Sequence, residues 1–339
     1  MPCRGQKSID DSTILLTGAT GFIGLALVSE LIKRGASLIC MHRKTSDTTG
    51  LLKLFSSSQV KHSLCECDFD DPLTVEQAIR HLQFDTVVHL AAVSAWNDLA
   101  RVDAYDSSFA YTKTLISALT RTTKHVNFIY ISSAAAGPAR RTLSEKPLLA
   151  LLNYASAKRD TETFLLKQSS DIVRRLVILR LAETYGPNDD RLVTAGNIME
   201  YIHKRLSFVT PGGLSILHRD DAVRTIANAI STGTHGHIYY VGGEDLTIAE
   251  LAREISKLCG TGTLSIQLPR ALIKPLVYIG RILHLTNYPQ ELTEYVCTYW
   301  FGDNKRAEID LGHTHRPARD TLRDVVSWLQ ACRGYSRNI

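Results

Sequence analysis

Short apolar runs alternate with amphipathic stretches through the first half of the chain. The apolar runs are nearly continuous, as in strands buried on both faces, and they occupy residues 13–16, 37–41, 62–67, 86–92 and 127–132. Apolar positions at helical spacing fill 25–33, the stretch after Pro72 and about 107–119. Regular alternation of this kind predicts a parallel sheet covered by helices on both faces, a doubly wound α/β fold.

Two more apolar runs, at 174–181 and 237–243, extend the predicted sheet to about seven strands. From about Thr184, turn-forming stretches separate isolated helices, which predicts a smaller C-terminal α/β lobe interleaved with the last strands. We therefore expect a disordered start at 1–11, a sheet domain at 12–183, a lobe at 184–333 and a tail at 334–339.

The lobe carries its own helix signals. Thr247 and Glu250 have the spacing of a capping box, and Gly260 predicts the end of the helix that they begin. Another amphipathic helix is expected at Leu322, Val325, Val326 and Leu329. The most apolar stretch, 271–285, is too short and too interrupted by charge to span a bilayer, which needs about 20 residues, so no transmembrane segment is expected.

Composition and charge narrow the class of protein. With 44% hydrophobic and 22% charged residues, the chain has the composition of an ordered soluble protein. The first eleven residues lack the apolar region of a secretory signal, and seven cysteines without a Cys-x-x-Cys pair favour reduced thiols, so we expect a cytoplasmic location. The net charge of +5 is spread along the chain, which suits an anionic ligand and gives no indication of nucleic-acid binding.

Cys65 and Cys67 alternate as residues of one strand, so both would point to the same face. Packing in the core and metal ligation are both compatible with that spacing, and packing is the simpler interpretation. No metal site is expected.

The stretch "TGATGFIG" places Gly18, Gly21 and Gly24 between the first strand and an amphipathic helix. Glycines in this context let the backbone turn sharply and bring helix N–H groups against a phosphate, although the same residues could form only a tight turn. The strand and helix on either side favour the first interpretation. Under that interpretation, residues 12–183 form a dinucleotide-binding Rossmann domain and residues 184–333 form mainly a substrate-binding lobe.

The end of the second strand is where a carboxylate would hold the ribose of NAD. The sequence there has His42, Arg43 and Lys44 and no acid, which favours NADPH as cofactor, with NAD still possible. Solvated basic residues are also common at such positions. Asp68, at the end of the third strand, could accept a hydrogen bond from the adenine amino group or could cap the helix that begins near Pro72.

Tyr154 and Lys158 are four residues apart and therefore share a helical face. A tyrosine with an ordinary pKa of about 10 is a poor acid or base at neutral pH, but a nearby ammonium together with an oxidised nicotinamide favours the phenolate. Ser133, at the carboxyl end of the fifth strand, could hold a substrate oxygen beside the tyrosine. We interpret these three residues as catalytic.

The stretches "TGATGFIG", "DFDD", "HLAA", "ISSAAAG", "YASAK", "RLAETYGPND" and "LHRDDAV" occur in the order found in the extended short-chain dehydrogenase/reductases. The chain resembles the branch with dihydroflavonol-reductase-like, sterol-dehydrogenase-like and sugar-epimerase-like enzymes. The resemblance implies Ser133, Tyr154 and Lys158 as catalytic residues and Asp221 as the cap of a lobe helix. The cofactor residues expected from these motifs are Gly18, Thr20, Gly21, Phe22, Ile23, Gly24, Arg43, Asp68, Phe69, Leu90, Ala91, Ala92, Tyr154, Lys158, Leu181 and Thr184.

Two departures from the family pattern bear on a water or proton relay and on the substrate, respectively. Ser107 and Ser108 occupy the region where the family usually has an asparagine, and Ala136 stands where nucleotide-sugar enzymes usually have a tyrosine before the glycine. The second departure argues against a nucleotide sugar.

The function expected is an NADP(H)-dependent oxidoreductase that interconverts a ketone or aldehyde and an alcohol on a largely apolar small molecule. The apolar stretch 271–285 supports that substrate if it lines the pocket, although it could instead be lobe core. The alternative is a nucleotide-sugar epimerase or dehydratase that retains its cofactor. Arg191 and Arg219 give only weak support for the basic residues that its diphosphate would need. A non-catalytic dinucleotide sensor is disfavoured by the retained Ser133, Tyr154 and Lys158.

A homodimer is also possible, through the helices that follow the fourth and fifth strands. The apolar residues that could form such an interface, or could simply pack on the sheet, are Phe109, Leu115, Ile116, Phe164 and Leu165.

Overall fold

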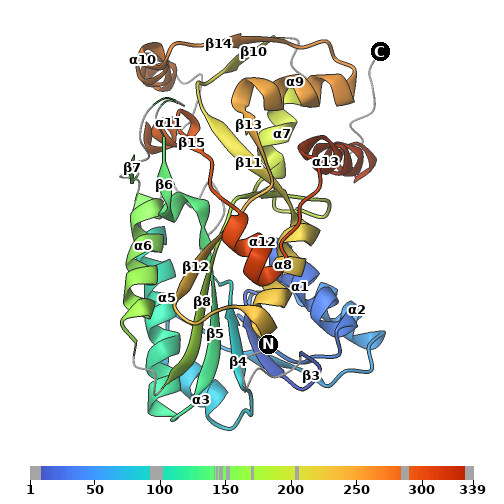
Figure 1. Ribbon diagram of the computed structural model, residues 1–339, viewed down its shortest axis with the longest axis vertical. Helices are drawn as coiled ribbons and strands as arrows, with labels where there is room; N and C mark the ends of the chain where they lie inside the picture. Colours follow the sequence, from blue (N-terminus) through green and yellow to red (C-terminus); the bar gives the residue numbers. More distant parts are fainter. Residues whose placement is uncertain are drawn as a thin grey trace.

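The computed structural model describes residues 9–91, 102–140, 142, 144, 148–149, 153–168, 172–202, 206–283 and 290–332. Its centre is a parallel sheet of seven strands in the order β12-β8-β5-β4-β1-β2-β3 (Figure 1). In that order the strands are His237–Val241, Val173–Leu181, Val126–Ser133, Thr86–His89, Thr13–Thr17, Ser37–His42 and His62–Glu66. The predicted doubly wound parallel sheet is confirmed.

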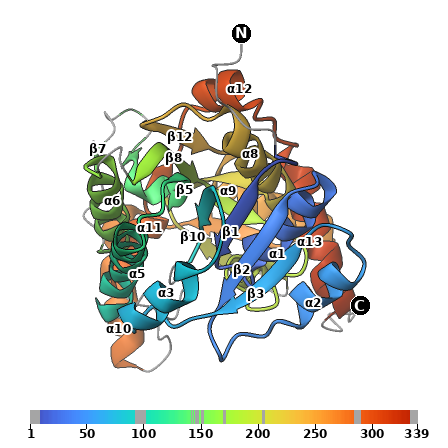
Figure 2. The same ribbon diagram turned by 90° about the horizontal axis from the view of Figure 1, so that it is seen from below.

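Helices cover both faces of the sheet (Figures 1 and 2). One face carries α1 (Phe22–Lys33), α2 (Thr49–Ser56), α8 (Arg219–Thr232) and α12 (Lys305–Leu311). The other face carries α3 (Pro72–Arg80), α5 (Val102–Arg121) and α6 (Asn153–Leu166). Side chains alternate between the two cores along each strand, so Ile14 and Leu16 lie in the first core while Leu15 lies in the second.

The second core answers two questions that the sequence left open. Cys67 is buried there and Cys65 packs against it, so both pack, and the described residues contain no cluster that could hold a metal ion. Leu115, Ile116 and Leu165 are also buried in this core, and Phe109 contacts Phe164 edge-on at 5.8 Å. These residues therefore pack on the sheet, and the homodimer stays a prediction.

A smaller lobe lies beyond the carboxyl ends of the sheet strands, in the upper half of Figure 1. Its strands are β9 (Glu183–Tyr185), β10 (Leu206–Val209), β11 (Gly213–His218), β13 (Glu244–Thr247), β14 (Leu264–Gln267) and β15 (Tyr299–Trp300). Its helices are α7 (Ala195–Ile202), α9 (Ile248–Cys259), α10 (Arg270–Ile282), α11 (Gln290–Val296) and α13 (Ala318–Cys332). The short strands β6 (Pro138–Ala139) and β7 (Leu148–Leu149) pair with each other beside it.

Local signals in the sequence explain the lobe helices. Thr247 and Glu250 form both hydrogen bonds of the capping box at the start of α9, and Gly260 ends that helix with a φ of +67°. The residues expected on the inner face of the last helix, Leu322, Val325, Val326 and Leu329, are all buried.

Of the N-terminal segment expected to be disordered, the structure describes residues 9–11, and Ile9 is buried in the first core. Residues 1–8 and the tail at 334–339 lie outside the described residues.

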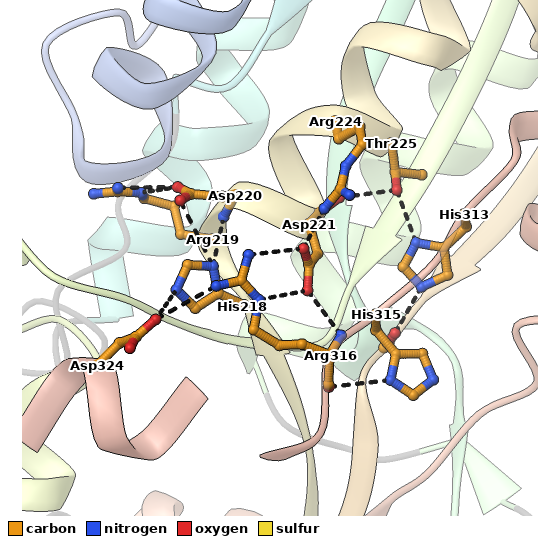
Figure 3. Close-up of polar contacts among 11 residues, drawn as sticks. His218, Arg219, Asp220, Asp221, Arg224, Thr225, His313, His315, Arg316 and Asp324 are labelled. Atoms are coloured by element: carbon orange, nitrogen blue, oxygen red, sulfur yellow. Dashed lines mark hydrogen bonds and ion pairs between the residues drawn. The ribbon is translucent and has the colours of Figure 1, made fainter. Parts of the chain in front are cut away.

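A polar network fastens the lobe's last segment to α8 (Figure 3). Asp221, buried in the first turn of α8, accepts hydrogen bonds from the backbone and guanidinium of Arg316 at 3.0–3.1 Å and also pairs with Arg224. His313 bridges Thr225, at 2.7 Å, and the carbonyl of Gly242, at 2.8 Å. The segment that leads into α13 is thus held against the end of the sheet.

This network corrects one expectation. Asp221 does not cap α8, because the cap is His218, whose Nδ1 accepts a hydrogen bond from the backbone N–H of Asp220 at 3.0 Å. Burial alone would raise the pKa of Asp221, but the hydrogen bonds from Arg316 and Arg224 outweigh burial and lower it. Asp221 therefore serves as the anion of a buried ion pair.

Replacing Arg316 with alanine should destabilise the protein by about 3 kcal/mol, because it leaves the Asp221 carboxylate buried with only Arg224 and the backbone N–H of residue 316 as partners. The matched control is Arg323→Ala, whose ion pair with Asp320 is half exposed on both sides and should contribute about 0–1 kcal/mol. Urea unfolding measures the free energy of unfolding of both variants. Since the pKa of Asp221 is lowered, its contribution is present at neutral pH and should disappear as the pH falls through that pKa. Equal stability of the two variants would contradict this role for the pair.

Candidate active site and cofactor site

The glycine stretch forms a turn that is crowded by the protein's own backbone. Gly18 has a φ of +73°, and a Cβ on it would lie 2.9 Å from the backbone nitrogen of Ala91. A Cβ on Gly24 would lie 2.1 Å from the carbonyl oxygen of Gly18. These two glycines are therefore required by the close approach of β1, α1 and β4.

The start of α1 suits an anion. Gly21 is its N-cap, without a side-chain hydrogen bond, and the first turn contains no acidic residue. A Cβ at Gly21 would meet only the Gly18 oxygen, at 3.3 Å. The backbone N–H groups at a helix start carry partial positive charge. The N–H of Gly21 already donates to the Gly18 carbonyl at 3.1 Å, so the N–H groups of Phe22 and Ile23 fit the pyrophosphate of a dinucleotide, with Gly21 giving it room.

A buried chain of hydrogen bonds fixes the strand ends beside this turn. Thr17 Oγ1 lies 2.7 Å from His89 Nδ1 and accepts from the Ala91 backbone N–H at 3.1 Å, while His89 Nε2 lies 3.0 Å from Thr112. Burial, aided by the nearby Lys158 ammonium, lowers the pKa of His89 to about 3, so its ring is neutral at physiological pH. This series of hydrogen bonds holds the backbone at Leu90 and Ala91 in place. Ala92 lies outside the described residues.

The residues expected at the adenosine end lie at the carboxyl ends of β2 and β3. Arg43 is exposed just after β2, and within the described part of the chain its guanidinium forms no hydrogen bond or ion pair. Asp68 is exposed and accepts from the Asp70 backbone N–H at 3.0 Å. The cap of α3 is instead Asp71, so capping does not explain Asp68, and the adenine hypothesis stays a prediction. Phe69 is buried against His89 and Tyr111.

The structure brings the three residues expected to be catalytic together at the carboxyl end of β5. Ser133 is the last residue of β5, where its Oγ accepts from the Ala135 backbone N–H at 3.2 Å, and its side chain is hydrogen-bonded to Tyr154. The Lys158 ammonium lies 6.0 Å from the centre of the Tyr154 ring. Tyr154 and Lys158 both lie on α6, one turn apart.

Burial dominates the pKa of Tyr154. It raises the pKa of the phenol, the hydrogen bond with Ser133 lowers it in part, and the Glu183 carboxylate raises it further. We expected the Lys158 ammonium to lower the pKa of Tyr154, but in the protein without a cofactor the effect of burial prevails. The phenol is protonated at neutral pH, which is the state needed to donate a proton.

Lys158 is buried in a position that the sequence alone did not reveal. Its ammonium donates a hydrogen bond to the Ile131 carbonyl at 3.3 Å and lies 5.2 Å from the centre of the Tyr130 ring. Burial lowers the pKa of Lys158 to about 8, and the carboxylate of Glu162 opposes that shift. Lys158 is thus still mostly charged at neutral pH.

Glu162 and Arg180 support the lysine, and sequence reasoning missed both. Glu162 is almost fully buried and accepts hydrogen bonds from Ser132 at 2.6 Å and from Arg180 at 2.6 and 2.9 Å. Two signals could have identified them: a glutamate one turn after Lys158, and an arginine inside the apolar run of β8.

Leu181 and Thr184, expected near the nicotinamide, are buried at the end of β8 and in β9. Between them, in the same stretch, lies Glu183, whose carboxyl the sequence did not single out. Tyr295, from α11, donates a hydrogen bond to Glu183 Oε2 at 3.0 Å. Burial raises the pKa of Glu183 to about 7, against the hydrogen bond from Tyr295, which lowers it. Because Glu183 also influences the pKa of Tyr154, this carboxyl belongs to the candidate site.

A doubly wound sheet with a glycine turn that suits an anion, and with a Ser-Tyr-Lys group at the same edge, is typical of a dinucleotide-dependent enzyme. The sequence profile of the NAD dependent epimerase/dehydratase family matches residues 14–242. The chain belongs to this family and is an NAD(P)-dependent oxidoreductase of the extended short-chain dehydrogenase/reductase type.

Individual relatives cover almost the whole chain. Sterol demethylase protein B of Methylococcus capsulatus is 23% identical, over 94% of this chain and 98% of its own length. The decarboxylating sterol-4-alpha-carboxylate 3-dehydrogenase of Dictyostelium discoideum is 25% identical, over 89% and 96%. The crystal structure of gox2253 matches the fold with a TM-score of 0.76 and 24% identity, over 95% of this chain and 98% of its own.

The Glu183 carboxyl should titrate with a midpoint near pH 7, whereas an ordinary glutamate titrates near about 4.3. Removing the donor phenol with Tyr295→Phe should move that midpoint higher still, because the charged carboxylate loses its hydrogen bond. Carbon NMR of glutamate-labelled protein follows the titration, and Glu183→Gln assigns the signal. A midpoint below about 5 in the wild type would show that the carboxyl is well hydrated and overturn the prediction.

Proposed function

We propose that this protein is an NADP(H)-dependent reductase or alcohol dehydrogenase that interconverts a ketone or aldehyde and an alcohol on a largely apolar small molecule. One observation carries the proposal: a protonated Tyr154 phenol, hydrogen-bonded to Ser133, lies beside the buried Lys158 ammonium at the edge of the sheet next to the glycine turn. A bound NADPH would supply the hydride for the reduction.

The side chains can then divide the work on the oxygen of the substrate. Ser133 can hydrogen-bond that oxygen, and Tyr154 can donate its proton to it as negative charge develops. The Lys158 ammonium stabilises the phenolate that remains, and Glu162 keeps that ammonium charged in its buried position. We expect Lys158 also to bind the ribose of the nicotinamide.

Two further observations support the finer parts of the proposal. Arg43 is exposed directly after β2, at the position where an NAD-binding domain would have an acidic residue. An arginine there favours a 2'-phosphate over a free ribose hydroxyl. The similarity to two proteins named for sterol chemistry supports a largely apolar substrate.

The diphosphate of a nucleotide sugar has less support. Arg219 is already engaged with Asp220, at 2.9 and 3.0 Å, and with the Pro187 carbonyl. It also lies 5.3 Å from the centre of the Phe22 ring.

The expected cofactor site residues remain Gly18, Thr20, Gly21, Phe22, Ile23, Gly24, Arg43, Asp68, Phe69, Leu90, Ala91, Ala92, Tyr154, Lys158, Leu181 and Thr184. Ser133, Tyr154 and Lys158 are the expected catalytic residues, and none of this requires a metal.

Arg43→Asp should weaken NADPH binding about 10- to 100-fold, because a charged hydrogen bond contributes about 1.5–3 kcal/mol, while NADH binding should change little. Lys61→Asp makes the same charge change at an exposed position before β3, away from the carboxyl edge of the sheet, and is the control. Isothermal titration of both nucleotides against the three proteins gives the comparison. Wild-type protein that binds NADH at least as tightly as NADPH would refute the cofactor preference.

A panel of apolar ketones tests the reaction itself. With a substrate, one NADPH should disappear for each alcohol formed, whereas an epimerase would turn over a nucleotide sugar without net NADPH loss. Tyr154→Phe should lower kcat by about 10²- to 10⁴-fold with nearly normal cofactor affinity, and the exposed Tyr278→Phe should change neither.

Lys158→Ala should lower both kcat and cofactor affinity. In the wild type, kcat should decline as the pH rises through about 8, where the buried Lys158 loses its proton. Full activity of Tyr154→Phe would exclude the mechanism.

A further inference from the structure

The helix α10 exposes apolar side chains that a protein normally buries. Leu272, Leu276, Ile279 and Leu283 follow one another at helical spacing, and each is about half exposed, with exposed fractions of 48–59%. Pro275, Tyr278 and Ile282 form a second exposed row beside them. Only a narrow third stripe, at Ile273, Val277 and Gly280, faces the lobe. The helix is therefore apolar on its outward side as well as on its inward side.

The small sheet next to α10 in the chain adds to this surface. Strands β10 and β14 pair in parallel with Phe208 opposite Ile266, and Leu264 lies two residues before Ile266 on the same face. All three side chains are exposed, by 60%, 41% and 64% respectively. In Figure 1, α10, β10 and β14 occupy the end of the lobe farthest from the seven-stranded sheet.

We call this end the apical surface and define it by its exposed apolar residues. They are Phe208, Leu264, Ile266, Leu272, Leu276, Tyr278, Ile279, Ile282 and Leu283. Among the described residues, nine of the thirteen large hydrophobic side chains that are exposed belong to it. Such a concentration indicates a surface with a partner, because exposed apolar residues elsewhere on the chain are scattered singly.

The charge of α10 selects among partners. Arg270 and Lys274 share one carboxylate, that of Glu294, with both contacts at 2.6–2.7 Å, so this group keeps a positive charge. The sequence of α10 also contains Arg281 and no acidic residue. Symmetric pairing with a second copy of the chain would place the positive charges of the two copies close to each other, which is unfavourable. An anionic lipid surface would instead attract them.

We propose that the apical surface binds an anionic membrane, with α10 lying in the plane of the lipid headgroups. The helix has 13 residues and is therefore about 20 Å long, too short to cross the hydrocarbon core of about 30 Å. None of the helices in the described ranges is long and apolar enough to span a bilayer. The apolar rows of α10 enter the membrane, while Arg270 and Lys274 stay with the headgroups.

The position of α10 connects this surface to the candidate site. Arg270, at the start of α10, donates to the Cys297 carbonyl at 2.8 Å and pairs with Glu294 on α11. The next residue of α11, Tyr295, reaches inward to Glu183. A membrane bound at the apical surface would thus contact α10, which is paired with the same helix, α11, that hydrogen-bonds Glu183 in the candidate site. The proposal itself does not depend on which reaction that site performs.

Vesicle flotation tests the proposal with the full chain. The protein should float with vesicles of phosphatidylcholine mixed with phosphatidylglycerol, and less with phosphatidylcholine alone or at high salt. The double variant Leu276→Glu and Ile279→Glu should bind at least about tenfold more weakly, because two carboxylates would have to enter the interface. Lys274→Glu should reduce only the preference for phosphatidylglycerol.

The matched control is Leu52→Glu with Leu73→Glu, two equally exposed leucines on α2 and α3. This variant should bind vesicles as the wild type does, and melting temperatures should show that both double variants fold. Three results would overturn the proposal: no vesicle binding by the wild type, equal loss in the control, or a concentration-dependent dimer that the Leu276 and Ile279 variant abolishes. The last result would assign the surface to a second copy of the chain.

Discussion

The close approach of backbone to backbone at the glycine turn is the constraint on which both the fold and the site depend. The Gly18 carbonyl lies where a side chain on Gly24 would be, and the Ala91 nitrogen lies where one on Gly18 would be. This contact lets α1 start immediately after the turn at residues 18–21 that follows β1, and it brings β4 alongside. The same geometry leaves the N–H groups of the first turn without a side-chain cap, so the packing of the sheet and the phosphate site that we propose would have one structural cause.

The charged side chains inside the sheet domain are arranged so that one buried ammonium, that of Lys158, keeps its charge. Lys158 is stabilised by Glu162, and Arg180 and Ser132 complete the hydrogen bonds of that carboxylate. His89, which is buried near the same ammonium, is neutral. A cationic histidine here would add a second positive charge, and the described side chains that hydrogen-bond its ring are threonines rather than acids. The hydrogen bonds of His89 to two threonines suit the neutral ring.

The sequence predicts the sheet well because alternation, helix caps and glycine turns are local signals. The strands, the capping box at Thr247 and the buried face of α13 depend on residues only a few positions apart. The helix at Thr49–Ser56 was not predicted, since its eight residues contain only two buried ones. Contacts between distant segments were also missed. Glu183 meets Tyr295, 112 residues away, and the partner of Asp221 is 95 residues away. No periodicity encodes such pairs.

The stretch 271–285 shows why periodicity could not decide between core and pocket. Ile273 is buried and Ile279 is half exposed, so residues of one apolar helix face opposite directions. A count of apolar positions cannot distinguish a helix buried on all sides from one buried on a single stripe. What distinguishes them is the rest of the lobe, which covers α10 on the side of α11 and leaves the outer rows uncovered within the described structure. The same lobe segment therefore presents Tyr295 inward, toward a carboxyl in the candidate site, and presents leucines outward, where only a partner could bury them.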